Sequence, residues 1–199
     1  MDHTIPAPTR RDRIMAAARA VFARHGYAKA RIDDIAAAAS VAKGTVYWYF
    51  RDKATLFCSV GEDLMSHDLA ATLHASSRPL SAVQCLSRLL EVFFSRLVSV
   101  HEESGSLMFE LWSSASTSVP GINEFLLRAH KRWRDAIKRI LEDGQNRGEF
   151  SARLDLDATA SLIMATLSGT IVNLRYGGKD ELSRLDHIRQ TLLLAVQAW

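Results

Sequence analysis

Proline is scarce in this chain of 199 residues, which contains only Pro6, Pro8, Pro79 and Pro120. Three long stretches, 9–78, 80–119 and 121–199, therefore lack the residue that most strongly interrupts helices. No segment shows the sustained alternation of apolar and polar residues that a half-buried strand needs. Together these two absences predict an all-α protein.

Cysteine is almost absent as well, because Cys58 and Cys85 are the two in the chain. They cannot build a disulfide framework, and neither belongs to a metal-binding motif. Each lies in an apolar pattern typical of a helix. We interpret both as buried or half-buried structural thiols, with redox sensing as the alternative.

Motifs of catalysis and metal binding are also lacking. No GxSxG, GxGxxG or phosphate-binding loop is present, and serine, histidine and acidic residues form no diagnostic constellation. His67 and His74 share one expected helix and His101 precedes two glutamates, but we interpret all three as surface or packing residues. We therefore expect neither an enzyme nor a bound metal or cofactor. A helical metal-binding or enzymatic protein is the remote alternative.

Long hydrophobic runs are missing too. The longest, Leu162 to Leu174, is interrupted by Thr, Ser, Gly and Asn and is shorter than the roughly 20 residues that span a bilayer. The first residues, MDHTIPAPTRRDR, lack the apolar region and cleavage site of a secretion signal. We expect a cytoplasmic protein that does not enter a membrane.

Acidic residues are rare at the N-terminus: residues 1–53 contain ten Lys and Arg residues against five Asp, whereas the rest of the chain has fifteen basic and seventeen acidic residues. A basic N-terminal part on a nearly neutral remainder suggests contact with a polyanion. On charge alone, a solvated charged surface is the simpler interpretation.

Apolar spacing and capping residues predict about nine helices. Those of the N-terminal part are expected from Thr9 to Gly26, Ile32 to Ala39, Lys43 to Phe50, and from beyond Asp52 to the region of Ser76-Ser77. A capping box at Ser81 and Gln84 predicts the next helix, to about His101. Further helices are expected at about Leu107 to Ser114, Leu126 to Gly148, Asp157 to Arg175 and Ser183 to Trp199.

The segment KGTVYWYF holds four aromatic residues, although aromatics make up only 8% of the chain. It lies on the second of two short helices joined by Ser40-Val41-Ala42, which have the size of a helix-turn-helix. Val46 and Phe50 would face inward and leave an outward set: Lys43, Thr45, Tyr47, Trp48 and Tyr49. Such a set suits a recognition helix, because donors and apolar groups read base edges and cations bind phosphates. Packing against the rest of the protein is the alternative, most open for Trp48.

Residues 10–57, and especially IDDIAAAASVAKGTVYWYFRDKATLF, resemble the DNA-binding domain of the TetR family of transcriptional regulators. The resemblance implies a helix-turn-helix DNA-binding domain at 1–53 and a helical ligand-binding and dimerisation domain at 54–199. It implies base contacts from Lys43, Gly44 and Tyr47, and contacts to the DNA backbone from Thr45, Trp48, Tyr49 and Lys53.

Three positions depart from the family pattern. Ser40 stands in the turn where Gly is usual, which would cost about 1 kcal/mol in a left-handed conformation. Ala42 replaces the common Ser or Thr cap of the recognition helix, a loss of roughly 1 kcal/mol. Ala30-Arg31 replaces a common Thr pair; Arg31 would contact a phosphate or simply be solvated.

The resemblance further implies a repressor that binds a palindromic double-stranded DNA operator as a homodimer, through residues about 157–175 and 183–198. It implies release by a small, largely apolar inducer; a DNA-binding regulator without an inducer is the alternative. Large apolar side chains expected to converge are pocket candidates, with Asn173 as a polar anchor and ordinary core packing as the alternative: Met65, Phe94, Phe109, Trp112, Trp133 and Met164.

Overall fold

The computed structural model describes residues 8–74, 80–100, 119–177 and 182–197. These residues form α-helices and no strand, apart from one isolated bridge between Phe150 and Gln197. The helices are α1 (Arg10–Lys29), α2 (Ile32–Ala38), α3 (Lys43–Tyr49), α4 (Lys53–His74), α5 (Ala82–Val100), α7 (Ile122–Asn146), α8 (Leu156–Gly177) and α10 (Leu185–Val196). The all-α prediction is confirmed. The short helix expected at 107–114 lies outside the described residues.

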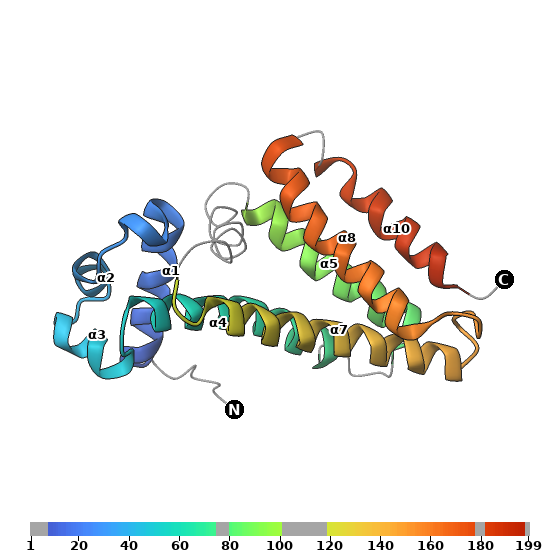
Figure 1. Ribbon diagram of the computed structural model, residues 1–199, viewed down its shortest axis with the longest axis horizontal. Coiled ribbons are helices and arrows are strands. Elements are labelled where there is room, and N and C mark those ends of the chain that lie inside the picture. The colour runs from blue at the N-terminus through green and yellow to red at the C-terminus, as the bar shows by residue number, and fades with distance from the viewer. Residues whose placement is uncertain (1–7, 75–79, 101–118, 178–181, 198–199) are drawn as a thin grey trace, which may run out of the picture.

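Helices α1, α2 and α3 gather at one end of an elongated molecule (Figure 1). Helices α4 and α7 run side by side from this head toward the other end, where α5, α8 and α10 are found. Among the described residues, no helix combines the length and the apolar character that crossing a membrane requires.

The predicted helix starts at Asp52 and Ser81 are confirmed by their capping contacts. The Asp52 carboxylate accepts hydrogen bonds from the Thr55 N–H at 2.7 Å and the Thr55 hydroxyl at 2.8 Å. Ser81 and Gln84 form the expected reciprocal capping box, at 3.0 and 3.1 Å. The start expected at Ser183 was slightly too early, because α10 begins at Leu185.

Helix α1 is broken where glycine was expected to end it. Gly26 has a φ of 72°, a left-handed conformation that favours glycine, and helical residues then continue to Lys29. The segment after Gly26 bends back toward the start of α4, and this geometry places the Tyr27 ring 4.9 Å from that of Phe57.

Buried side chains form two hydrophobic clusters. The head cluster joins α1, α2 and α3 with the first half of α4 and with Ile122 and Phe125 of α7. The body cluster joins α5, α7, α8 and α10. Met65 of α4 is half-buried and packs against both clusters. The packing of the head therefore extends beyond residue 53, into two helices that also form the body.

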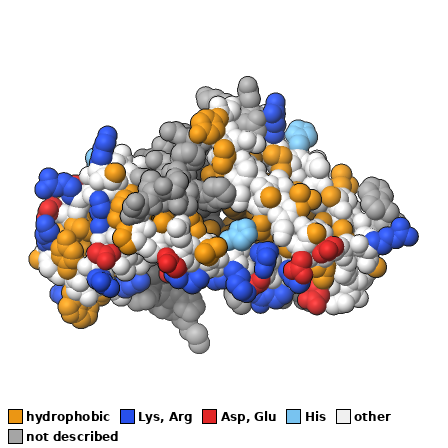
Figure 2. All heavy atoms as spheres, viewed as in Figure 1, with side chains coloured by type: hydrophobic (Ala, Val, Ile, Leu, Met, Phe, Trp, Pro, Cys, Tyr) orange, Lys and Arg blue, Asp and Glu red, His pale blue; other side chains and the backbone are white. Residues whose placement is uncertain are grey.

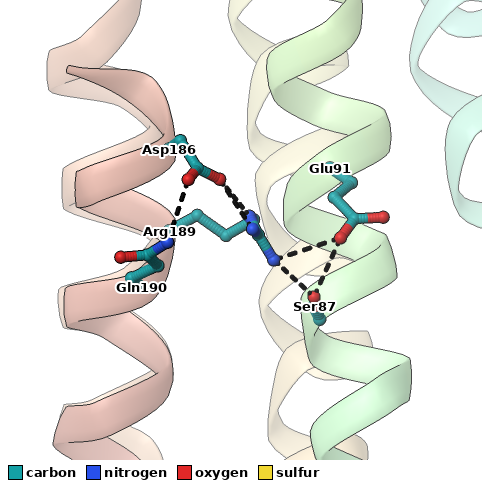
Figure 3. A network of polar contacts seen from close by, with 5 residues as sticks. All are labelled: Ser87, Glu91, Asp186, Arg189 and Gln190. Atoms are coloured by element: carbon teal, nitrogen blue, oxygen red, sulfur yellow. Dashed lines mark hydrogen bonds and ion pairs between the residues drawn. The ribbon is translucent and has the colours of Figure 1, made fainter. Parts of the chain in front are cut away.

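Helix α10 is fixed to α5 by a polar network around Arg189 (Figure 3). The Arg189 guanidinium donates to Ser87 at 2.9 Å and to Glu91 at 3.1 Å, both on α5. It also pairs with Asp186, one turn earlier on α10, at 2.6 Å. Because only 21% of the Arg189 side chain is exposed, these contacts orient α10 more firmly than a solvated ion pair would.

Candidate nucleic-acid interface

The connection between α2 and α3 is a tight turn with one strained residue. The Ser40 N–H donates to the Ala37 carbonyl and the Val41 N–H to the Ala36 carbonyl, both at 3.0 Å. Ser40 has a φ of 52°, the left-handed conformation that its sequence position suggested. Ala42 occupies the N-cap of α3 and supplies no side-chain hydrogen bond. The turn is therefore formed without the glycine and the capping hydroxyl that would favour it.

Helix α3 separates inward from outward side chains as predicted. Val46 is 1% exposed and Phe50 3%, whereas Tyr47 is 46% and Trp48 77% exposed. A large aromatic side chain that is three-quarters exposed is unusual unless it meets a partner. Hydrophobic and basic side chains share the surface at the end of the molecule formed by α2 and α3 (Figure 2).

The remaining candidates on α3 are placed more variably. Lys43 and Gly44 are exposed, and Thr45 and Tyr49 are half-buried. Tyr49 packs against the head cluster, and its ring centroid lies 4.6 Å from that of Trp48 in an edge-to-face arrangement. Tyr49 thus supports the exposed indole from behind, so its ring serves packing as well as any contact with DNA.

Lys43 and Arg31 meet at one carboxylate. The Lys43 ammonium lies 2.9 Å from Oδ1 and 3.0 Å from Oδ2 of Asp33, and Arg31 lies 3.8 Å from Oδ2. Asp33 lies in the first turn of α2, where the helix dipole favours negative charge. Its role as a partner of Lys43 depends on the three-dimensional approach of α2 to α3, which the sequence does not display.

Lys53 is placed differently from the expectation of a free phosphate contact. Its ammonium donates to the carbonyl oxygens of Tyr27 at 2.8 Å, Ala30 at 3.1 Å and Ala28 at 3.4 Å. The same ammonium lies 4.5 Å from the centroid of the Tyr27 ring. An ammonium has three donors, so in this conformation all of them are directed at the protein.

Adjacent acidic residues of α4 connect the head to the body. Asp63 pairs with Arg19 of α1 at 2.5 Å, and Glu62 lies 3.9 Å from Arg128 of α7. The Arg128–Glu62 pair is the more solvated of the two and contributes little to stability, whereas the Arg19–Asp63 pair is part-buried. Because Glu62 and Asp63 are adjacent, α4 contacts α1 and α7 within one turn.

Four of the expected pocket residues belong to the body cluster or pack against it. Phe94, Trp133 and Met164 are buried in the body cluster, against which Met65 packs. The Trp133 indole donates to the Met65 carbonyl at 3.3 Å. Asn173 is exposed and so does not join them as a polar anchor. Phe109 and Trp112 lie outside the described residues.

The cysteines are half-buried and lie on different helices, Cys58 on α4 and Cys85 on α5. Burial raises the pKa of both thiols, and nearby Glu62 raises the pKa of Cys58 further. A raised pKa leaves less thiolate, so both are poorly suited to redox chemistry. In the part of the chain that the structure describes, no three His, Cys, Asp or Glu side chains are placed to hold a metal ion.

Helices α8 and α10 carry apolar side chains that the single chain leaves uncovered. Leu162 and Tyr176 of α8 and Leu194 of α10 are each more than half exposed. A Cβ atom added to Gly169 of α8 would meet nothing within 4 Å, so this stretch of the helix surface is open. Helices α8 and α10 both lie in the body, away from α3 (Figure 1).

Two family models match this chain, one in its N-terminal part and one in its C-terminal part. Residues 14–60 match the family model described as bacterial regulatory proteins, tetR family. Residues 82–192 match the model described as tetracyclin repressor-like, C-terminal domain. The first match includes all of α2 and α3, and the second spans α5, α7 and α8 and reaches into α10.

Known proteins are similar over most of the chain. A fatty acid metabolism regulator protein of Bacillus subtilis is 28% identical over 158 residues, which cover 79% of each chain. An HTH-type transcriptional repressor of Streptomyces coelicolor is 33% identical over 161 residues, covering 80% of this chain and 77% of the relative. The structure of a fatty acid degradation regulator from Bacillus halodurans has a TM-score of 0.79 at 25% identity, covering 94% of this chain and 100% of the other.

Proposed function

Because the chain belongs to the TetR family of bacterial regulatory proteins, we propose that it represses transcription by placing α3 in the major groove of a DNA operator. The observation that carries the proposal is the exposure of Tyr47 and Trp48 on a helix whose inner side is buried. A rigid inner side holds the outer side chains in fixed directions, which readout of base edges requires.

The candidate contact residues of α3 fall into two groups by the chemistry of their side chains. Lys43 and Tyr47 carry donors suited to base edges, and Gly44 lets the backbone approach. Contacts to the DNA backbone fall to the hydroxyls and ring N–H of Thr45, Tyr49 and Trp48, which suit phosphate oxygens. Arg31 adds a positive charge beside them, whereas Lys53 would first have to leave the three carbonyl groups that it contacts.

The operator is proposed to be palindromic and to be bound by a homodimer, because a two-fold axis presents the same helix to two half-sites. The exposed apolar residues of α8 and α10 support this assembly, since pairing them with a second copy would remove them from water. The interface would involve residues about 157–175 and 183–198, as the sequence suggested.

The body is proposed to bind a small, largely apolar inducer beside Met65, Phe94, Trp133 and Met164. The match of residues 82–192 to a tetracyclin repressor-like C-terminal domain supports a ligand-binding body. Because Trp133 of α7 donates to α4, a ligand that moves this indole would act on the helix leading to the head. The burial of Phe94, Trp133 and Met164 is equally what a solid core shows, so a regulator without an inducer is the competing function.

The DNA-binding proposal is tested by selecting sequences from a pool of random DNA duplexes with the purified protein. We expect enrichment of a palindromic site, and Tyr47→Ala or Trp48→Ala to weaken binding to that site by at least tenfold without lowering thermal stability. Leu127→Ala, which truncates an exposed leucine of α7, is the matched control and should bind normally. Failure to enrich any sequence, or normal binding by both α3 variants, would refute the assignment.

A thermal-shift screen of apolar compounds distinguishes a repressor that responds to an inducer from a regulator that does not. A stabilising compound that also lowers affinity for the selected site supports an inducible repressor. Stabilisation without any change in affinity for the site supports the regulator that lacks an inducer.

A further inference from the structure

Asp33 is the single described carboxylate that contacts two of the cations expected to face DNA. Both of its oxygens lie within 3.0 Å of the Lys43 ammonium, and one lies 3.8 Å from Arg31. Lys43 is the first residue of α3, and Asp33 is in the first turn of α2, so this ion pair joins the two helices of the helix-turn-helix.

The ion pair contributes little to folding. The Asp33 and Lys43 side chains are 48% and 52% exposed, and ion pairs this solvated add little to stability. Lys43 can therefore leave Asp33 at small cost. The helix dipole favours an acidic residue in the first turn of α2, but Asp34 in the same turn already provides that charge.

For DNA binding the same pair has a larger consequence. Non-specific affinity comes from cations that neutralise phosphates, and it depends little on sequence. Asp33 satisfies Lys43 internally and repels phosphates, so it opposes this general attraction. A base edge that accepts hydrogen bonds from Lys43 offers a directed replacement for the carboxylate, which a passing phosphate does not.

We propose that Asp33 is a specificity-determining residue, which lowers affinity for DNA of any sequence by holding Lys43 until a matching base edge replaces it. The inference rests on the proposed binding of DNA through α3. It differs from a simple effect of net charge, because it requires the contact between Asp33 and Lys43.

Asp34 provides a matched control. It is adjacent, exposed, and makes no ion pair with the described residues, so Asp34→Asn makes the same change in charge without touching Lys43. Both variants are compared with the wild type by fluorescence anisotropy, on a duplex of random sequence and on the duplex selected by the wild-type protein, over a range of salt concentrations.

We expect Asp33→Asn to raise affinity for the random duplex about two- to fivefold more than Asp34→Asn does, the range that corresponds to one exposed ion pair. The ratio of specific to non-specific affinity should fall by a similar factor. In a Lys43→Met background the difference between the Asn variants should become much smaller, because only the 3.8 Å approach of Arg31 to Asp33 remains.

Equal effects of Asp33→Asn and Asp34→Asn in the wild-type background would overturn the proposal, and so would a difference that is undiminished without Lys43. Circular dichroism of each variant separates these outcomes from loss of folding. If the wild-type protein selects no sequence at all, the DNA-binding function itself fails. That result is distinct from a failure of the Asp33 proposal, which requires a wild-type protein that binds.

Discussion

The ammonium of Lys53 lies 4.5 Å from the centroid of the Tyr27 ring and donates to the Tyr27 carbonyl at 2.8 Å. Two further carbonyl groups, of Ala28 and Ala30, accept from the same ammonium. The backbone that follows the break at Gly26 has unused acceptors, as helix ends do, and a cation at this place satisfies them. Lys53 therefore joins the first turn of α4 to the end of α1.

Replacing Lys53 by methionine keeps most of the apolar stem and removes the donors. We expect a loss of about 2 kcal/mol in the free energy of unfolding, the usual worth of hydrogen bonds from a charged group. Lys29→Met removes an equal charge from an exposed residue nearby and should change stability little. Denaturant unfolding of both variants measures the difference.

The same variants decide whether Lys53 also binds a phosphate. A lost phosphate contact reduces the dependence of log affinity on log salt by about one unit. The intramolecular contacts predict an unchanged salt dependence for Lys53→Met. Unchanged stability combined with a weaker salt dependence would show instead that the carbonyl contacts give way to DNA.

Ser40→Gly is expected to stabilise the protein by about 1 kcal/mol, because Ser40 holds a φ of 52° that glycine adopts without a steric penalty. Ser40→Ala retains a Cβ atom and should bring no such gain. The midpoint of urea unfolding compares the two. A glycine variant no more stable than the alanine variant would show that the turn is not strained at this residue.

Local signals made helix starts and the sides of α3 predictable. Asp52 and Ser81 cap helices as expected, because a capping residue contacts backbone only three residues away. The inward and outward sides of α3 followed from helical periodicity, with Val46 buried and Trp48 exposed.

Contacts between distant parts of the chain were beyond this reasoning. Phe125 is fully buried in the head cluster although it lies far along the chain in α7, and no periodicity tells which helix covers it. The resemblance implied a contact of Lys53 with the DNA backbone and gave no sign of its carbonyl partners. These partners follow a break in α1, which brings the backbone close to Lys53. Asn173 was grouped with apolar residues of other helices, but its position on α8 turns it to solvent.

Gly144→Ala is expected to destabilise the body. A Cβ atom at this position would clash with the ring of Phe150, which is buried in the body cluster. Overpacking of this kind costs about 1–3 kcal/mol. Gly44→Ala, where a Cβ atom meets nothing within 4 Å, should be neutral or stabilising when unfolding is measured without DNA. Equal stability of the two variants would contradict the close contact.

Asp52 is expected to make the free energy of unfolding depend on pH in the acidic range. Hydrogen bonds from the Thr55 N–H and hydroxyl hold the pKa of Asp52 below its ordinary value. The carboxylate therefore stabilises the folded state above its unfolded pKa, and this contribution is lost as pH falls through the lower folded pKa. The stability difference between wild type and Asp52→Asn should be largest at neutral pH and shrink in acid. A constant difference across this range would contradict the assignment.

Dimerisation through α8 and α10 is tested by placing charge on each helix. Leu162→Glu and Leu194→Glu put a carboxylate where apolar side chains are exposed, and two-fold symmetry would bring each new charge into the interface twice. We expect both variants to sediment as folded monomers at concentrations where the wild type is a dimer. Their affinity for a palindromic site should fall, because each head then binds its half-site without the other.

Leu127→Glu is the matched control for this test, since Leu127 is just as exposed but lies on α7. It should leave both sedimentation and DNA binding unchanged. Helix α10 keeps its position in the Leu194 variant, because Arg189 holds it to Ser87 and Glu91 of α5. A monomeric variant that unfolds less cooperatively would point to damage within the chain. Wild-type sedimentation by both α8 and α10 variants would place the dimer interface elsewhere.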